Sequence, residues 1–141
     1  LREELDFIQN YLKIEQTRFQ DRLEVALDIE GPALQVPVPS LILQPLVENA
    51  IKHGFANQSG EGRITITGRL QEGSKLALEV KDNGRGSVEE TPALLQKGIG
   101  LRNVRDRLAL LYGPHALFAC VTAPGAGFAV TLTLPTQKPN L

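Results

Sequence analysis

The sequence is poor in sulfur and in aromatic residues. Its 141 residues include one cysteine, Cys120, no methionine and no tryptophan. A single cysteine excludes an internal disulfide framework and a cysteine-rich zinc site, so a cytoplasmic location is the default expectation. Because a natural chain begins with methionine, its absence predicts that the sequence is a piece of a longer protein.

The sequence also lacks an excess of charge and any long apolar run. A formal net charge of −1 offers no basic surplus for phosphate contacts, so no nucleic-acid partner is expected. No apolar run approaches the length of a membrane span and no signal peptide opens the chain, so we expect no membrane contact by this segment itself. A hydrophobic fraction of 42% over 141 residues is enough to build the core of one domain.

The apolar patterns predict an irregular succession of helices and strands. We expect helices at residues 1–19, 40–54 and 100–112, and strands at residues 22–30, 63–70, 75–82, 117–122 and 128–134. Short turns join the last four strands into two hairpins. The order predicts an α/β (α+β) two-layer sandwich, with a mixed, mostly antiparallel sheet of about five strands covered on one face by helices. Ser40 is the expected N-cap of the second helix, and Pro45 either sits in its first turn or kinks it.

The first helix carries an apolar seam that a charge interrupts once, at Glu15. The apolar members of the seam are Leu1, Leu5, Ile8, Leu12 and Phe19. Such a seam is typical both of an amphipathic helix on the domain's own core and of the end of a longer dimerisation helix. We expect residues 1–20 to be the C-terminal end of a dimerisation or linker helix, 21–136 the main domain and 137–141 a frayed tail.

Three polar clusters are candidates for chemistry. On the second helix, Glu48, Asn49, Lys52 and His53 share one face through spacings of one, three and four. A solvated face with a Glu48–Lys52 pair explains most of this pattern. Asn49 fits that explanation poorly, because asparagine is a weak helix former and its amide oxygen can ligate a hard cation.

The other two clusters are rich in glycine. Residues 82–86, Asp-Asn-Gly-Arg-Gly, follow a strand and form either a simple turn or an acceptor for an exocyclic amine at Asp82. Residues 98–100, Gly-Ile-Gly, precede a helix and would expose backbone N–H groups to an anion. A dinucleotide fingerprint is excluded, because Asn103 replaces its third glycine and no strand immediately precedes the motif.

Taken in order, these clusters resemble the motifs of the GHKL, or Bergerat-fold, ATP-binding superfamily. Residues 46–54 resemble its N box, 82–86 and 98–101 its two glycine boxes, and 125–127 the glycine turn before its last strand. The resemblance is more specific in three segments: the sequences of residues 5–19, 45–49 and 98–112 resemble those of sensor histidine kinases of the LytS type.

The resemblance implies a role for each matched residue. Asp82 would accept a hydrogen bond from the adenine amino group of ATP, and Asn49 would ligate Mg²⁺. Lys52 would offset phosphate charge, with His53 nearby, while Glu48 would orient or deprotonate the nucleophile. The remaining members would shape the pocket and present backbone N–H groups to phosphate: Gly84, Gly86, Gly98, Gly100 and Leu101.

The resemblance also implies a function. The chain would be the cytoplasmic catalytic domain of a membrane-anchored, homodimeric sensor kinase, transferring the γ-phosphate of ATP to an upstream histidine for relay to a response regulator. Pro45 stands where gyrase-type relatives carry a general-base glutamate, so water activation by that route is not expected. Neither His53 nor His115 is placed to accept phosphate, so we expect this chain to bind ATP without phosphorylating itself.

Two alternatives remain open at this point. One is a stand-alone serine kinase of the anti-sigma-factor type, which would phosphorylate a partner protein. The other is an interaction domain that keeps the fold and has lost turnover.

Overall fold

The computed structural model describes residues 1–19, 22–55, 61–84, 99–122, 125 and 127–138, with only the backbone of 53–55 and 99. The helical elements are α1 (Arg2–Arg18), η1 (Gly31–Gln35), α2 (Gln44–Asn49), η2 (Ala50–Phe55), α4 (Ile99–Tyr112) and η3 (Gly113–His115). The strands are β1 (Leu23–Ile29), β2 (Gly62–Gln71), β3 (Lys75–Asp82), β4 (Leu117–Thr122) and β5 (Phe128–Pro135). No helix among the described residues is both long and apolar enough to cross a bilayer.

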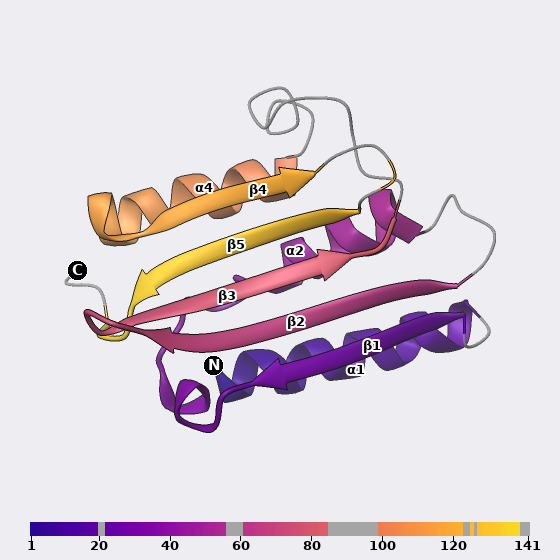
Figure 1. Ribbon diagram of the computed structural model, residues 1–141, viewed down its shortest axis with the longest axis horizontal. Helices are drawn as coiled ribbons and strands as arrows, with labels where there is room; N and C mark the ends of the chain where they lie inside the picture. The colour runs from indigo at the N-terminus through magenta and orange to yellow at the C-terminus, as the bar shows by residue number, and fades with distance from the viewer. Residues whose placement is uncertain (20–21, 56–60, 85–98, 123–124, 126, 139–141) are drawn as a thin grey trace.

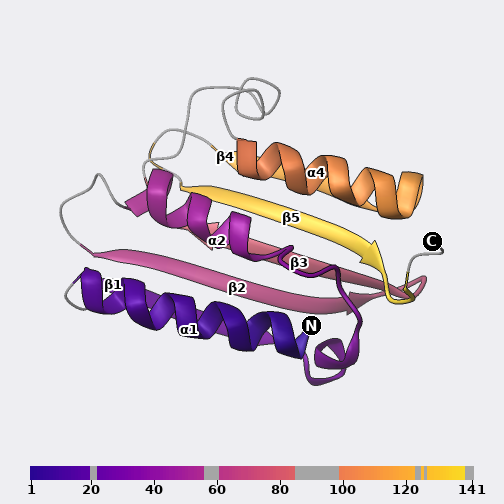
Figure 2. The same cartoon turned by 180° about the vertical axis from the view of Figure 1, so that it is seen from behind.

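The five strands form one sheet in the order β1-β2-β3-β5-β4 (Figure 1). β1 and β2 run parallel, and every other neighbouring pair is antiparallel. Helices α1, α2 and α4 all lie against one face of the sheet (Figure 2). The structure therefore confirms the predicted two-layer fold and both predicted hairpins.

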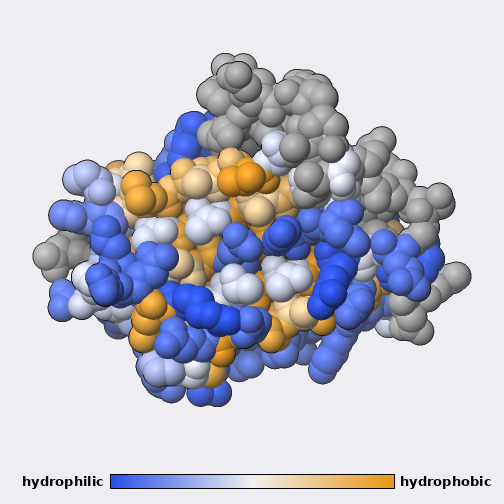
Figure 3. All heavy atoms as spheres, viewed as in Figure 1, coloured by the Kyte–Doolittle hydropathy of each residue, from blue (hydrophilic) through white to orange (hydrophobic). Residues whose placement is uncertain are grey.

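The core lies between the sheet and these helices. Alternate residues of β3 point into it, and one stripe of α4 faces them; the buried members are Leu76, Leu78, Val80, Leu101, Val104 and Leu108. Burying each such side chain contributes about 1.5–3 kcal/mol. The opposite face of the sheet is open and largely hydrophilic, except for an apolar area over β4 (Figure 3). Two exposed apolar residues of the edge strand β4 are Leu117 and Val121.

Helix α1 packs its seam against this core. Leu5, Ile8 and Leu12 are buried there, and Glu15 is buried with them while it pairs with Arg18 at 3.3 Å. The domain itself thus covers the seam within the described residues. The assignment of residues 1–20 to a dimerisation or linker helix stays a prediction.

The start of α2 depends on a residue of α1 that the sequence did not single out. The N-cap position is Leu43, so the predicted cap at Ser40 is wrong. Instead, the buried carboxylate of Glu4 accepts hydrogen bonds from the backbone N–H groups of Leu41 and Leu43, both at 3.0 Å. Leu41 has a φ of 58°, a conformation that few leucines adopt. Pro45 sits in the first turn, which decides the alternative left open by the sequence.

Replacing Glu4 with alanine is expected to lower the free energy of unfolding by about 2–4 kcal/mol, because two backbone N–H groups, that of Leu43 buried and that of Leu41 partly buried, lose a charged acceptor. Glu3→Ala is the matched control, since Glu3 is the preceding residue and is exposed; its effect should stay within about 0.5 kcal/mol. Urea denaturation of both variants measures the difference. Equal losses would show that the Glu4 carboxylate does not hold the start of α2.

The second helix also departs from its predicted form. We expected one continuous helix to residue 54, but α2 ends at Asn49 and the chain continues as the π-helix η2. Hydrogen bonds in a π-helix span five residues, so the turn is wider there, and such turns occur frequently at functional sites. The short 3₁₀ helix η1 was not predicted, because Gly31-Pro32 indicated only the end of a strand.

Candidate functional site

Asp82, the last residue of β3, is a buried carboxylate. The residue is only 4% exposed. Its Oδ1 accepts a hydrogen bond from the Gly84 N–H at 2.8 Å. The backbone N–H of Phe128, its partner across the sheet, also donates to the carboxyl group. Burial raises the pKa of Asp82, and these two hydrogen bonds partly offset the rise.

The backbone around Asp82 is held from two sides. The Asn83 side chain accepts a hydrogen bond from the Arg63 N–H at 2.8 Å, and the Asn83 N–H donates to the Arg63 carbonyl at 3.2 Å. On the other side, Gly127 lies so close that a Cβ there would be 2.1 Å from the Asp82 carbonyl oxygen. Its φ of 73° also favours glycine. The exit of β3 is therefore fixed in position.

The N-box residues lie on α2 and η2. Asn49, at the end of α2, is half-buried, while Glu48 and Lys52 are exposed. Glu48 accepts a hydrogen bond from the Gln44 side chain at 2.7 Å, and within the described residues the structure shows no ion pair between Glu48 and Lys52. Glu48 therefore contacts Gln44, one helical turn earlier, instead of the predicted partner Lys52. Since η2 packs beside β3, this segment adjoins the strand that carries Asp82.

The beginning of α4 supplies a third component. Gly100 is exposed, and a Cβ added to it would lie 3.6 Å from Pro45, which places this end of α4 beside the start of α2. The first four N–H groups of any α-helix lack partners within the helix and attract anions. Leu101 is buried in the core, so only its backbone is available to a ligand.

Two predicted positions lie outside what the structure describes, and a third is described only in its backbone. Gly86 and Gly98 belong to residues 85–98, and for His53 only the backbone is described. The sequence reasoning, in turn, missed Phe128 as a donor to Asp82. The predicted strand at residues 128–134 was the available signal, because its first residue pairs with the end of β3.

The described parts meet at one end of the sheet, where β3 ends, α2 continues into η2 and α4 begins (Figures 1 and 2). A buried carboxylate there suits an amino group on a flat ring, and unpartnered helix N–H groups suit an anion. The described residues contain no group of three metal-ligating His, Cys, Asp or Glu side chains. A hard cation at this end would therefore rely on the Asn49 amide oxygen and on oxygens of the ligand, which is the usual arrangement for Mg²⁺ with phosphates.

Comparison with known proteins agrees with this geometry. Residues 37–138 match the family of histidine kinase-, DNA gyrase B- and HSP90-like ATPases. The sensor histidine kinase YpdA of Escherichia coli is 41% identical over 144 residues, covering 98% of this chain and 25% of that protein. The sensor protein LytS of Enterococcus faecalis is 33% identical over 148 residues, covering 99% of this chain and 25% of that protein.

Solved structures share the fold at lower identity. The catalytic domain of histidine kinase ThkA aligns with a TM-score of 0.70 and 19% identity, covering 96% of this chain and 93% of that one. The histidine kinase domain of a blue-light activated kinase from Erythrobacter litoralis aligns with a TM-score of 0.67 and 21% identity. The alignment covers 90% of this chain and 58% of that one. The chain spans about a quarter of the length of the two curated relatives described above. On the family match and these sequence identities, the chain belongs to the histidine kinase-, DNA gyrase B- and HSP90-like ATPase family.

Proposed function

We propose that this chain is the ATP-binding catalytic domain of a sensor histidine kinase. The observation that carries the proposal is the buried Asp82 carboxylate, held at the end of β3 beside η2 and at the same end of the sheet as the beginning of α4. Membership of the ATPase family and the sequence similarity to sensor kinases support the proposal.

Each described residue then has a task. Asp82 accepts a hydrogen bond from the adenine amino group, which requires the carboxylate form. Asn49 offers its amide oxygen to Mg²⁺, and Lys52 lies exposed where it can offset phosphate charge. When bound, ATP supplies the phosphoryl group that is transferred. Phosphoryl transfer asks a protein mainly for positioning and charge stabilisation, so this small set is adequate.

Further residues of the three motifs belong to the proposed site. We propose that His53, Gly84, Gly86, Gly98 and Gly100 complete the nucleotide pocket together with the backbone of Leu101. Glu48 is exposed and held by Gln44, and we assign it the orientation or deprotonation of the acceptor. Because Pro45 occupies the first turn of α2, no carboxylate one turn before Asn49 is available to activate water.

The wider context is also part of the proposal. The acceptor is a histidine upstream of this chain, in a homodimeric, membrane-anchored protein that passes the phosphoryl group to a response regulator. The sensor kinases among the relatives support this context. A serine kinase of the anti-sigma-factor type, with the same pocket, is the competing function.

The test is phosphorylation of the longer protein with ATP labelled at the γ-phosphate. We expect acid-labile label on the longer protein and none on this chain alone. Asn49→Ala should abolish the label, because the amide ligand is lost, whereas Asn10→Ala on the exposed face of α1 should leave it unchanged. Glu48→Gln should transfer more slowly than the unsubstituted protein.

Other outcomes identify the alternatives. Acid-stable label on a serine of a co-purified partner would support the serine kinase. ATP binding without any label on the longer protein would support an interaction domain that has lost turnover. A Glu48→Gln protein that transfers at the full rate would remove Glu48 from the mechanism.

A further inference from the structure

Glu4 of α1 is a buried carboxylate whose partners are backbone groups rather than cations. Two other buried carboxylates have evident roles, since Asp82 belongs to the proposed site and Glu15 forms a salt bridge within α1. Glu4 has no Lys, Arg or His partner among the described residues. A buried charge is unfavourable unless it is paired or well hydrogen-bonded. Its Oε2 accepts the Leu41 N–H and its Oε1 the Leu43 N–H, so the charge is spent on one turn, residues 41–43.

The 41–43 turn has a backbone conformation that its own sequence does not favour. Leu41 has a φ of 58°, and a leucine persists in this region only where its surroundings hold it there. The Leu41 side chain is 52% exposed, so packing holds it only in part. Ile42 and Leu43 are fully buried and anchor the end of the turn in the core. The Glu4 carboxylate holds its beginning, because it gathers the N–H groups on both sides of Ile42.

This turn fixes the positions of two helix ends in the candidate site. Leu43 is the N-cap of α2, which continues without interruption to Asn49, so a displaced start would displace Asn49 as well. Pro45, in the first turn of α2, lies 3.6 Å from where a Cβ on Gly100 would be, and α2 contacts α4. Figure 2 shows α2 between α1 and α4. The phosphate half of the site, defined as Asn49 and the beginning of α4, therefore depends on the turn.

Asp82, the adenine half of the site, is held by other contacts. Asn83 is bound to the backbone of Arg63 in β2, and Gly127 lies against the Asp82 carbonyl group from the side of β5. None of these contacts involves Glu4 or the 41–43 turn. A change at Glu4 should therefore reach one half of the site and leave the other in place.

We propose that Glu4 is a positioning residue for the phosphate half of the nucleotide site, an inference that rests on the proposed function. Through the 41–43 turn, its carboxylate aligns the Asn49 amide oxygen with the N–H groups at the beginning of α4. Glu4 touches no ligand itself. Its contribution is to the binding of the Mg²⁺-bound phosphates, and the adenosine part of ATP binds without it.

Glu4→Gln tests this proposal with little change in shape. The glutamine oxygen can accept one of the two N–H groups, but its amide group then faces the other, donor against donor. Binding of ATP with Mg²⁺, measured by calorimetry, should weaken at least tenfold. Binding of adenosine, measured by NMR titration, should change less than twofold. Glu3→Gln is the matched control, since Glu3 is adjacent and exposed, and it should leave both affinities unchanged.

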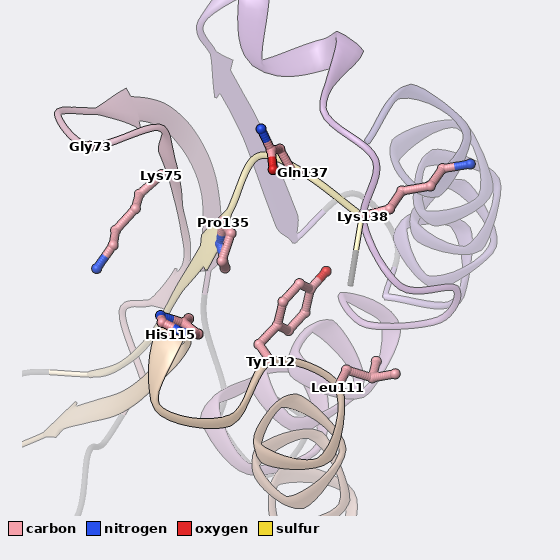
Figure 4. Close-up of a pocket in the computed structure, with 8 residues that line it drawn as sticks. All are labelled: Gly73, Lys75, Leu111, Tyr112, His115, Pro135, Gln137 and Lys138. Carbon is pink, nitrogen blue, oxygen red and sulfur yellow. The ribbon is translucent and has the colours of Figure 1, made fainter. Parts of the chain in front are cut away.

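Amide NMR of the ligand-free chain supplies a readout that does not depend on nucleotide binding. Glu4→Gln should shift the amide signals of Asn49 and Gly100 and leave that of Asp82 in place. Lys75 and His115 are the reference residues for a general loosening of the fold. They line a surface hollow at the other end of β3 from Asp82, and Figure 4 shows them well to the side of α1. Their amide signals should not move.

The outcomes separate positioning from a purely structural role. Equal weakening of ATP and adenosine binding, or shifts that extend equally to Lys75 and His115, would mean that Glu4 serves the fold alone and would overturn the proposal. Unchanged ATP affinity in Glu4→Gln would overturn it too. If the unsubstituted, folded chain binds no ATP, the proposed function fails instead. The ligand-free spectrum then decides by itself whether Glu4 positions Asn49 and Gly100.

Discussion

Asp82→Asn is expected to lower the affinity for ATP about 100-fold while the chain stays folded. The asparagine oxygen can still accept the Gly84 N–H, but its amide group would then face the adenine amino group, donor against donor. Losing a hydrogen bond to a charged acceptor and leaving a donor unpaired together cost about 3 kcal/mol, which is roughly 100-fold in Kd. Calorimetry with ATP and Mg²⁺ measures the change, with Asp6→Asn on the exposed face of α1 as control.

The same substitution should not destabilise the ligand-free chain at neutral pH. Burial raises the pKa of Asp82 in the folded state, so folding there disfavours the charged form. That penalty is present at neutral pH and disappears as pH falls through the raised pKa toward the value in the unfolded chain. Asp82→Asn should therefore be at least as stable as the unsubstituted chain at pH 7, with its advantage shrinking in acid. A clear loss of stability at pH 7 would mean that Asp82 serves the fold rather than a ligand.

Gly127→Ala is expected to lower the free energy of unfolding by more than about 3 kcal/mol, and it should weaken ATP binding as well. The new Cβ would lie 2.1 Å from the Asp82 carbonyl oxygen and 3.0 Å from its carbonyl carbon, both backbone atoms that cannot turn aside. The strands would have to separate at the point where Asp82 is held. Chemical denaturation measures the loss.

Gly125→Ala is the matched control for this clash. Gly125 has a φ of 74°, almost the same as Gly127, but a Cβ there would meet nothing within 4 Å. Gly125→Ala should lower the free energy of unfolding by about 1–2 kcal/mol, which is the backbone strain of an alanine at positive φ. If both variants lose the same stability, the close approach of Gly127 to Asp82 does not matter and the strain alone explains the effect.

Much of the fold could be predicted because it follows from local patterns. The alternation in Leu76, Leu78 and Val80 reports directly which face of β3 is buried, and the turn at residues 71–74 predicts the β2–β3 hairpin. The position of Asp82 at a strand end followed from the same alternation. Its burial did not, because that depends on Gly84 folding back and on β5 lying alongside.

The features that were mispredicted or missed depend mostly on interactions between residues far apart in the chain. Ser40 is a good local cap, yet Glu4, more than thirty residues earlier, holds the start of α2. The widening of the helix at Ala50 has no composition signal, since its 3.6-residue pattern continues. The close approach of Gly127 to Asp82 is likewise a tertiary contact that a glycine-rich turn does not specify.

The most direct test of the central claim compares ATP with inosine triphosphate, whose purine carries an oxygen in place of the amino group. Calorimetry with Mg²⁺ on the unsubstituted chain should show ATP binding at least 20-fold tighter, and Asp82→Asn should remove the preference. Those results would mean that Asp82 recognises the adenine amino group. Equal affinity for the two nucleotides in the unsubstituted chain would contradict the assignment of Asp82, and no binding of either by the folded chain would contradict the nucleotide site itself.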